Sequence, residues 1–94
     1  MSIIWSPRAL AHLTALRAHI SQDNPNAARR IAATLLDAVE HLAEHPNIGR
    51  PGRVAGTREL VVPGTRYVFP YRVRSDRLEI VAVFHSHQKW PDRL

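Results

Sequence analysis

The sequence predicts a single two-layer α+β domain, in which an N-terminal strand and a helical hairpin pack on an antiparallel β-meander. Three observations support this fold class. Two successive stretches in the first half carry apolar residues at helical spacing, and three short apolar runs with strand character fill residues 58–90. The chain has 94 residues, enough for one hydrophobic core but not for two. We therefore expect residues 1–94 to form one domain.

The chain begins with a predicted strand and a predicted helix. Ser2 to Trp5 is a short apolar run with β-branched residues, which is typical of a strand. Ser6 followed by Pro7 predicts a helix start, because a Ser side chain caps free amides and Pro at the first position has no amide to lose. The apolar residues that follow form one helical stripe, namely Leu10, Leu13, Leu16 and Ile20.

Asn24 and Pro25 predict the boundary between two helices. Pro25 disfavours the helical conformation at Asn24, so the first helix ends there and Asn24 caps the second. His45-Pro46 ends the second helix in the same way, and a short connection predicts an antiparallel hairpin that covers one sheet face. The second stripe comprises Ala28, Ile31, Leu35, Ala38, Val39 and Leu42. Residues 46–56 have the composition of a surface loop.

Residues 58–90 predict the meander, with turns at Pro63-Gly64 and Ser75-Asp76. In the middle run Tyr67, Phe69, Tyr71 and Val73 alternate with Arg66, Val68, Pro70, Arg72 and Arg74. One face can therefore be buried while the other carries positive charge. The third run, Leu78 to His85, is apolar on both faces, as expected of a central strand. Pro70 cannot donate to a ladder, so its missing amide must point off a sheet edge or into a bulge.

Positive charge is concentrated in the second half. Residues 1–49 hold four Arg against four Asp and Glu, whereas residues 50–94 hold nine Lys and Arg against four acids. Twelve of the thirteen cations are Arg, whose planar guanidinium favours forked binding of phosphate or carboxylate. Such an asymmetry is typical of a protein that binds nucleic acid or an acidic partner. We expect the uncovered, Arg-rich face of the sheet to be the binding surface.

Several kinds of site are absent from the sequence. Without cysteine, the fold cannot rest on disulfides or on a Cys-based metal centre. Neither a phosphate-binding loop nor a nucleophile elbow occurs. His41 and His45 lie four residues apart, but no Glu directly follows His41 as the zincin signature requires. We interpret them as solvated residues at a helix end, and His12 and His19 as surface residues. We expect no metal and no cofactor.

No apolar run is long enough to span a membrane. The N-terminus also lacks the basic and then apolar layout of a signal peptide. These two features lead us to expect a soluble cytoplasmic protein.

His85 and His87 are the candidate catalytic residues. If the strand continues through both, their spacing places them on one face, where they can exchange protons near neutral pH. Cleavage of RNA by its 2′-hydroxyl requires a group that takes a proton, a group that gives one, and cations over the phosphate. The candidate phosphate ligands are Arg58, Arg66, Arg72 and Lys89. The alternative is that both His are polar residues that close a strand.

Two further residues have competing interpretations. Glu59 is an alternative base for the same chemistry or an ion-pair partner of neighbouring arginines. Trp90 either stacks on a base of the substrate or plugs the core beneath the C-terminal tail.

Three segments carry a resemblance to a known family: IIWSPRALAHL, DNPNAARRIAATLLDAVEHLAEHPNIGRPGR and GTRELVVPGTRYVFPYRVRSDRLEIVAVFHSHQKWP. Together they resemble a RelE/ParE-family toxin of a bacterial type II toxin–antitoxin pair. The resemblance covers nearly the whole chain and implies the RelE-like fold described above. It also implies a cognate antitoxin whose C-terminal segment wraps the toxin and covers part of its basic surface, as a toxin–antitoxin hetero-oligomer.

The resemblance leaves two targets open. RelE-type members cut mRNA in the ribosomal A site, whereas ParE-type members poison DNA gyrase without a known hydrolytic centre. Val68 stands where RelE has a catalytic Arg, in the pattern Y-R-L-V-Y. Arg66, two residues earlier, is the candidate substitute, and a second catalytic Arg of the family falls near His87. The C-terminal Tyr of RelE has no match here. We favour mRNA cleavage, with gyrase inhibition as the alternative.

Overall fold

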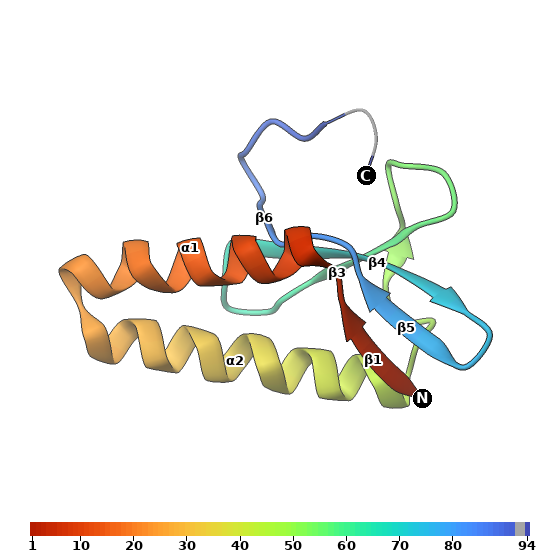
Figure 1. The fold of residues 1–94 in the computed structure, drawn as a ribbon, viewed down its shortest axis with the longest axis horizontal. Helices are drawn as coiled ribbons and strands as arrows, with labels where there is room; N and C mark the ends of the chain where they lie inside the picture. The colour runs from red at the N-terminus through yellow and green to blue at the C-terminus, as the bar shows by residue number, and fades with distance from the viewer. Residues whose placement is uncertain (92–93) are drawn as a thin grey trace.

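The computed structural model describes residues 1–91 and 94. Figure 1 shows two helices side by side, extending beyond a sheet that forms the other half of the molecule. The elements follow one another as β1 (Ser2–Trp5), α1 (Pro7–Asp23), α2 (Pro25–Glu44), β2 (Arg50–Pro51), β3 (Arg58–Val61), β4 (Tyr67–Arg74), β5 (Arg77–Ile80) and β6 (Phe84–His85). This is the predicted α+β order. Among the described residues, no helix is long and apolar enough to cross a membrane.

Both helices begin at the predicted caps. The Ser6 side chain accepts a hydrogen bond from the Ala9 amide at 3.0 Å, and the Asn24 side chain accepts one from Ala27 at 3.1 Å. The predicted stripe of α1 is wrong at one position. Leu10 is 51% exposed, whereas Ala9 is fully buried, because the small side chain lets the helix start lie close to the sheet.

The strands form one sheet in the order β1-β5-β4-β3-β2. β3, β4 and β5 pair antiparallel, so the predicted meander is confirmed. β1 adds a feature that the sequence did not reveal, because it pairs with β5 in parallel, with Ile3 opposite Leu78. The sheet is therefore mixed. Its two turns contain the expected residues in left-handed conformation, Gly64 at φ 76° and Ser75 at φ 55°.

The third run is not one continuous strand. It pairs with β4 as β5, leaves the ladder over residues 81–83, and pairs again with β4 as β6. Pro70 explains the interruption. Its carbonyl accepts from the Val81 amide at 2.9 Å, and its missing amide points to the same side, where the partner strand has left the ladder. Pro70 thus faces the break, as predicted, although β4 itself is an interior strand.

Each sheet face has its own core. On the helix side, buried residues of α1 and α2 pack on Phe69, Tyr71, Leu78 and Ile80. On the outer side, Val68 and Phe84 form a smaller cluster with Ala82 and Trp90. The outer face is therefore not a bare charged surface, because the segment after β6 covers its centre.

Candidate functional site

Arg66 and His85 meet at the end where β4 begins and β6 ends. The pairing places Tyr67 opposite His85, and the Ser86 amide donates to the Arg66 carbonyl at 2.7 Å. The two side chains line one surface hollow of about 270 Å³, together with Tyr67 and Ile31. The Tyr67 and His85 rings meet edge to face, with centroids 5.7 Å apart. A cation and an imidazole thus share one site.

His87 lies against His85, although the strand does not continue through both. The chain turns after His85, where the Gln88 amide donates to the His85 carbonyl at 3.0 Å. The predicted shared strand face is therefore wrong, but the turn still holds the two rings 5.6 Å apart. The His87 amide donates to Nδ1 of His85 at 3.2 Å. Nδ1 of His85 is therefore an acceptor, so the neutral ring carries its proton on Nε2.

His12 is a residue that the sequence reasoning assigned to the surface. Its Nδ1 accepts from the Val83 amide at 3.1 Å, and its ring contacts Phe84 at 5.2 Å between centroids. It lines a groove of about 340 Å³ between α1 and the end of the sheet, with Tyr67 and His85. Burial, together with the nearby Arg8 charge, lowers the pKa of His12 below 6.5. This contact joins α1 to the segment between β5 and β6, 71 residues further along the chain, so no local sequence pattern indicates it.

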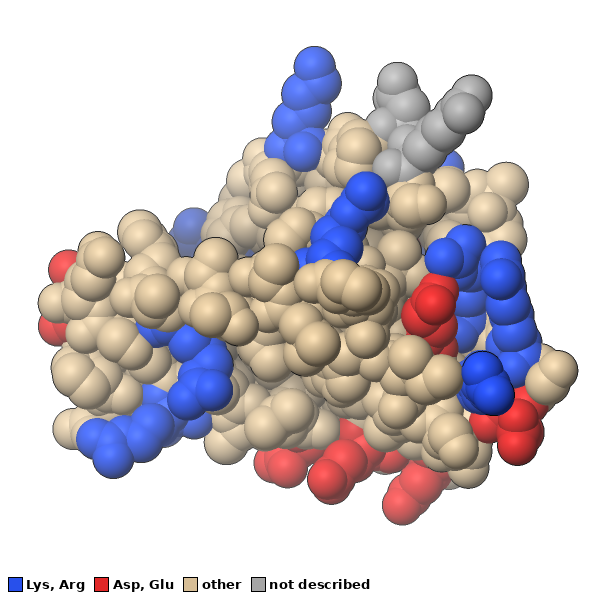
Figure 2. Space-filling model, viewed as in Figure 1, with Lys and Arg blue, Asp and Glu red and all other residues tan. Residues whose placement is uncertain are grey.

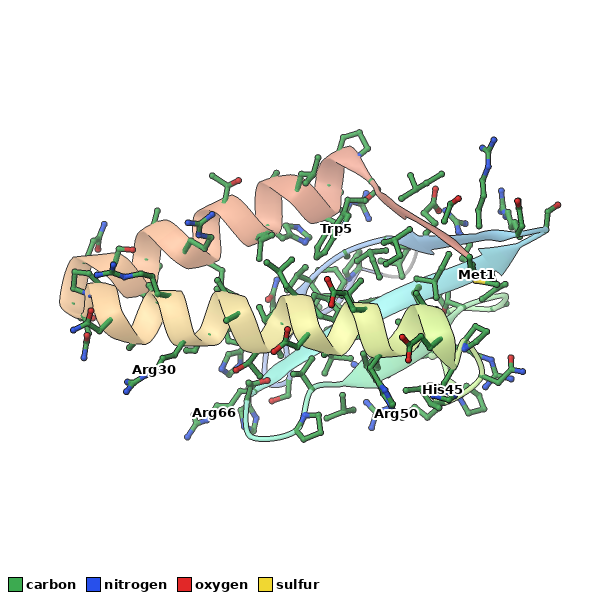
Figure 3. All side chains as sticks on the ribbon, turned by 90° about the horizontal axis from the view of Figure 1, so that it is seen from below. Met1, Trp5, Arg30, His45, Arg50 and Arg66 are labelled. Carbon is green, nitrogen blue, oxygen red and sulfur yellow. The ribbon has the colours of Figure 1, made fainter. Side chains whose placement is uncertain are left out.

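Two of the remaining predicted phosphate ligands, Arg58 and Arg72, are bound to other partners. Arg58 lies opposite Tyr71 and donates to the Gly49 carbonyl at 2.7 Å. Arg72 forms a hydrogen-bonded ion pair with Glu79 at 2.9 Å. Lys89 is exposed on the segment that follows His87. Figure 3 shows Arg66 apart from Arg50, which lies on β2, the strand that pairs with β3 beside Arg58. The predicted set of basic residues is thus divided.

Glu59 ties two more arginines to the outer face. Its carboxylate is 3% exposed and accepts from Nε of Arg50 at 3.0 Å and from the Arg53 amide at 2.8 Å. Burial alone would raise the pKa of Glu59, but these hydrogen bonds and the two guanidinium charges lower it below 4.5. Of its two interpretations, the contacts favour the ion-pair partner. The expected surface of free arginines is to this extent wrong.

Trp90 is a core plug. It is 9% exposed, packs on Phe84 with centroids 4.6 Å apart, and carries the Arg53 guanidinium 3.7 Å from its ring centre. Both contacts occupy the surfaces that a stacked base would need. The contacts therefore favour a core role for Trp90, the second of its two interpretations.

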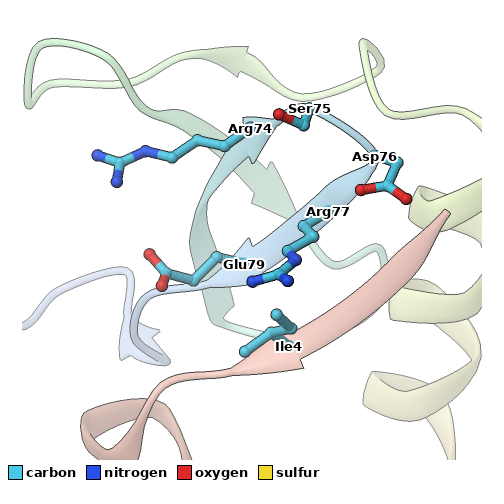
Figure 4. A pocket seen from close by; sticks show the side chains of 6 residues that line it. All are labelled: Ile4, Arg74, Ser75, Asp76, Arg77 and Glu79. Carbon is cyan, nitrogen blue, oxygen red and sulfur yellow. The ribbon is translucent and has the colours of Figure 1, made fainter.

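A further hollow, of about 410 Å³, lies elsewhere. Figure 4 shows it at the turn between β4 and β5, where Arg74 and Arg77 stand beside Asp76 and Glu79. Figure 2 likewise shows blue and red side chains close together at this end. Because its lining carries both signs of charge, this hollow suits an anion less well than the Arg66–His85 hollow, whose lining includes no acidic residue.

The fold defines a small RelE-like α+β domain. Arg66, His85 and His87 form a candidate site at one end of its sheet. The family model of the ParE toxin of type II toxin–antitoxin systems matches residues 3–90. The chain is 48% identical to Y4kP of Sinorhizobium fredii, over 98% of this chain and 95% of that protein. It is 44% identical to Toxin RelE2 of Caulobacter vibrioides, over 89% of this chain and 93% of that protein.

A solved structure of the chromosomal ParDE system from P. aeruginosa superposes with a TM-score of 0.80 and 26% identity. The match covers 90% of this chain and 95% of that one. The extent of these matches is decisive. The chain belongs to the ParE toxin family of type II toxin–antitoxin systems.

Proposed function

We propose that this toxin-family member arrests growth as a ribosome-dependent mRNA endonuclease of the RelE type. The observation that supports this target is the site itself, in which Arg66 and His85 line one hollow and His87 contacts His85. His87 could take a proton and Arg66 could hold the phosphate, which are two of the three roles that cleavage by the RNA 2′-hydroxyl requires. The relatives named RelE2 and RelE3, 44% and 36% identical, support the same choice.

The three side chains divide the reaction between them. His87 takes the proton from the 2′-hydroxyl, whose oxygen attacks the adjacent phosphorus. The bond from phosphorus to the 5′ oxygen breaks, and that oxygen takes a proton from water. Nε2–H of His85 and the Arg66 guanidinium hold the phosphate oxygens as negative charge grows on them. The products are a 2′,3′-cyclic phosphate and a 5′-hydroxyl, and His87 returns its proton to solvent.

The proposed partner is a cognate antitoxin, which forms a hetero-oligomer with the chain. The net charge of +5 lies wholly in residues 50–94, so an acidic C-terminal antitoxin segment would bind there. Its contact with the Arg66–His85 hollow would block the site. A small neighbouring gene with an acidic tail in the same operon is the simplest expected sign of this partner.

The test is to map mRNA 5′ ends in cells that express the chain. We expect new ends inside translated codons with the wild-type chain and none with His87→Gln, which alters only an exposed side chain. Glu79→Gln, at the opposite end of the sheet, is the matched control and should still produce the ends. Growth arrest without new mRNA ends would exclude this function.

DNA gyrase inhibition is the second candidate. The solved ParDE structure and the ParE family model favour it. In this case the chain would act as a binding protein, and His87→Gln would leave its toxicity unchanged. Purified gyrase, assayed for supercoiling and for trapped cleavage complex, tests this candidate. Full gyrase activity with the chain in excess would exclude it.

A further inference from the structure

We propose that the C-terminal end of α2 binds a divalent transition-metal ion, and that Zn²⁺ suits the site best. The ligands are His41, Glu44 and His45, whose candidate ligand atoms all lie within 4.8 Å of one another. The two imidazole rings lie 4.8 Å apart between centroids and are tilted by 51°. This site is separate from the Arg66–His85 hollow and does not depend on the proposed target.

The helix brings these ligands together. Residues three and four apart share one face of a helix, so His41 and His45 lie one turn apart with Glu44 beside them. All three are exposed, and packing does not hold their rotamers. Tetrahedral zinc with ligands at about 2.0–2.1 Å needs ligand atoms about 3.4 Å apart, and rotation of these free side chains can close the difference.

The donor set determines the kind of ion. Two imidazole nitrogens and one carboxylate oxygen suit Zn²⁺ better than Mg²⁺ or Ca²⁺, which prefer oxygen ligands. Three protein ligands leave a fourth position for water. The zincin signature is still absent, because Glu44 does not directly follow His41. We therefore assign a binding site and no hydrolytic role.

The surrounding charge favours a cation. Glu40 and Asp37 are exposed on α2, one and two turns before Glu44 respectively, on the same side of the helix. Figure 2 shows acidic side chains gathered along the lower edge of the molecule, where Figure 1 places α2. In a chain with a net charge of +5, this edge is a locally negative surface.

Metal binding would fasten the end of α2 to the following loop. His45 ends the helix, and its amide donates to the carbonyls of His41 and Leu42. The next residue, Pro46, accepts a hydrogen bond from the buried Tyr71 hydroxyl at 2.7 Å. An ion bound by His41 and His45 would thus join the last helical turn to the segment that Tyr71 anchors.

The experiment titrates the untagged chain with Zn²⁺ by calorimetry at neutral pH, because a histidine tag would itself bind the ion. We expect one site per chain and at least a tenfold loss of affinity in His41→Gln and in His45→Gln. Even changes to outer-shell partners of a metal typically cost about 10–100-fold in affinity, so loss of a ligand should cost at least as much as the lower end of that range. His19→Gln, an exposed histidine on α1, is the matched control and should bind like the wild type. Circular dichroism checks that each variant is folded.

Hydrogen exchange supplies a second readout. Zn²⁺ should slow exchange in residues 44–49 of the wild-type chain and leave them unchanged in His41→Gln. The proposal is overturned if the wild-type chain binds no Zn²⁺. It is equally overturned if binding survives in both α2 variants, or is lost instead in a His85→Gln, His87→Gln double variant.

Discussion

Glu59→Gln tests how the outer face of the sheet is held together. The Glu59 carboxylate is buried and receives hydrogen bonds from Arg50 and from both the amide and the side chain of Arg53. Gln keeps the shape but removes the charge, and it sets an amide donor against a guanidinium donor. Arg53 also covers Trp90, so the change loosens the outer core as well.

The loss of folding stability in Glu59→Gln depends on how exposed its two arginine partners are. Removing one member of a fully buried pair costs about 3–5 kcal/mol, because the other charge stays buried. Here the Arg50 and Arg53 side chains are 53% and 47% exposed, so water solvates them after the change. The cost is then that of charged hydrogen bonds, about 1.5–3 kcal/mol. For a domain of this size the melting temperature should fall by roughly 6–24 °C.

The assay is thermal and urea denaturation of both variants at neutral pH. Glu79→Gln is the matched control, because its ion pair with Arg72 is partly exposed and should be worth about 0–1 kcal/mol. The pKa of Glu59 is lowered in the fold, so its stabilisation is present above pH 4.5 and is lost as the pH falls through the folded pKa. The reasoning is refuted if Glu59→Gln costs no more than Glu79→Gln at pH 7.

Two other changes give equally direct results. Tyr71→Phe should cost about 1–3 kcal/mol in urea denaturation, since it leaves the Gly49 amide and the Pro46 carbonyl without their buried partner; an unchanged midpoint would contradict this. The pKa of His12 is lowered by burial, so the stability it supports is present above pH 6.5 and is lost as the pH falls through the folded pKa. His12→Asn keeps an acceptor for the Val83 amide but cannot titrate, so its stability should fall less between pH 7 and pH 5; equal slopes would show that His12 has no part in it.

Local chemistry made much of the fold predictable. Ser6 and Asn24 cap the helices because their side chains accept from amides three residues ahead, a contact that depends on neighbouring residues alone. The turns at Gly64 and Ser75 are also local features, because each turn has one of these residues in the left-handed backbone conformation. Pro70 has no amide to donate, so the sequence indicated an interruption of the ladder at this position. It did not indicate that the neighbouring run, at residues 81–83, would be the one to leave the ladder.

The parts that escaped prediction depend on contacts between distant residues. Nothing near β1 specifies that it pairs in parallel with β5, and no local pattern indicates that His12 contacts Val83. In the same way, Glu59 contacts Arg50 across the pairing of β2 with β3, and Arg53 from the loop that follows β2. Charge counted along the sequence therefore overstated the free positive surface. The sequence analysis grouped Arg66 with His85 on chemical grounds, but their proximity arises from the register of β4 and β6, which no local pattern specifies.

The central claim is that the cluster of Arg66, His85 and His87 cleaves mRNA on the ribosome. The most direct measurement is the rate at which the purified chain cuts a defined mRNA on ribosomes halted at a known codon, followed by primer extension. We predict a cut in the A-site codon, slowed by about 10²–10⁴-fold in His87→Gln and unchanged in Glu79→Gln. Intact mRNA with the wild-type chain, or equal rates for all three proteins, would contradict the claim.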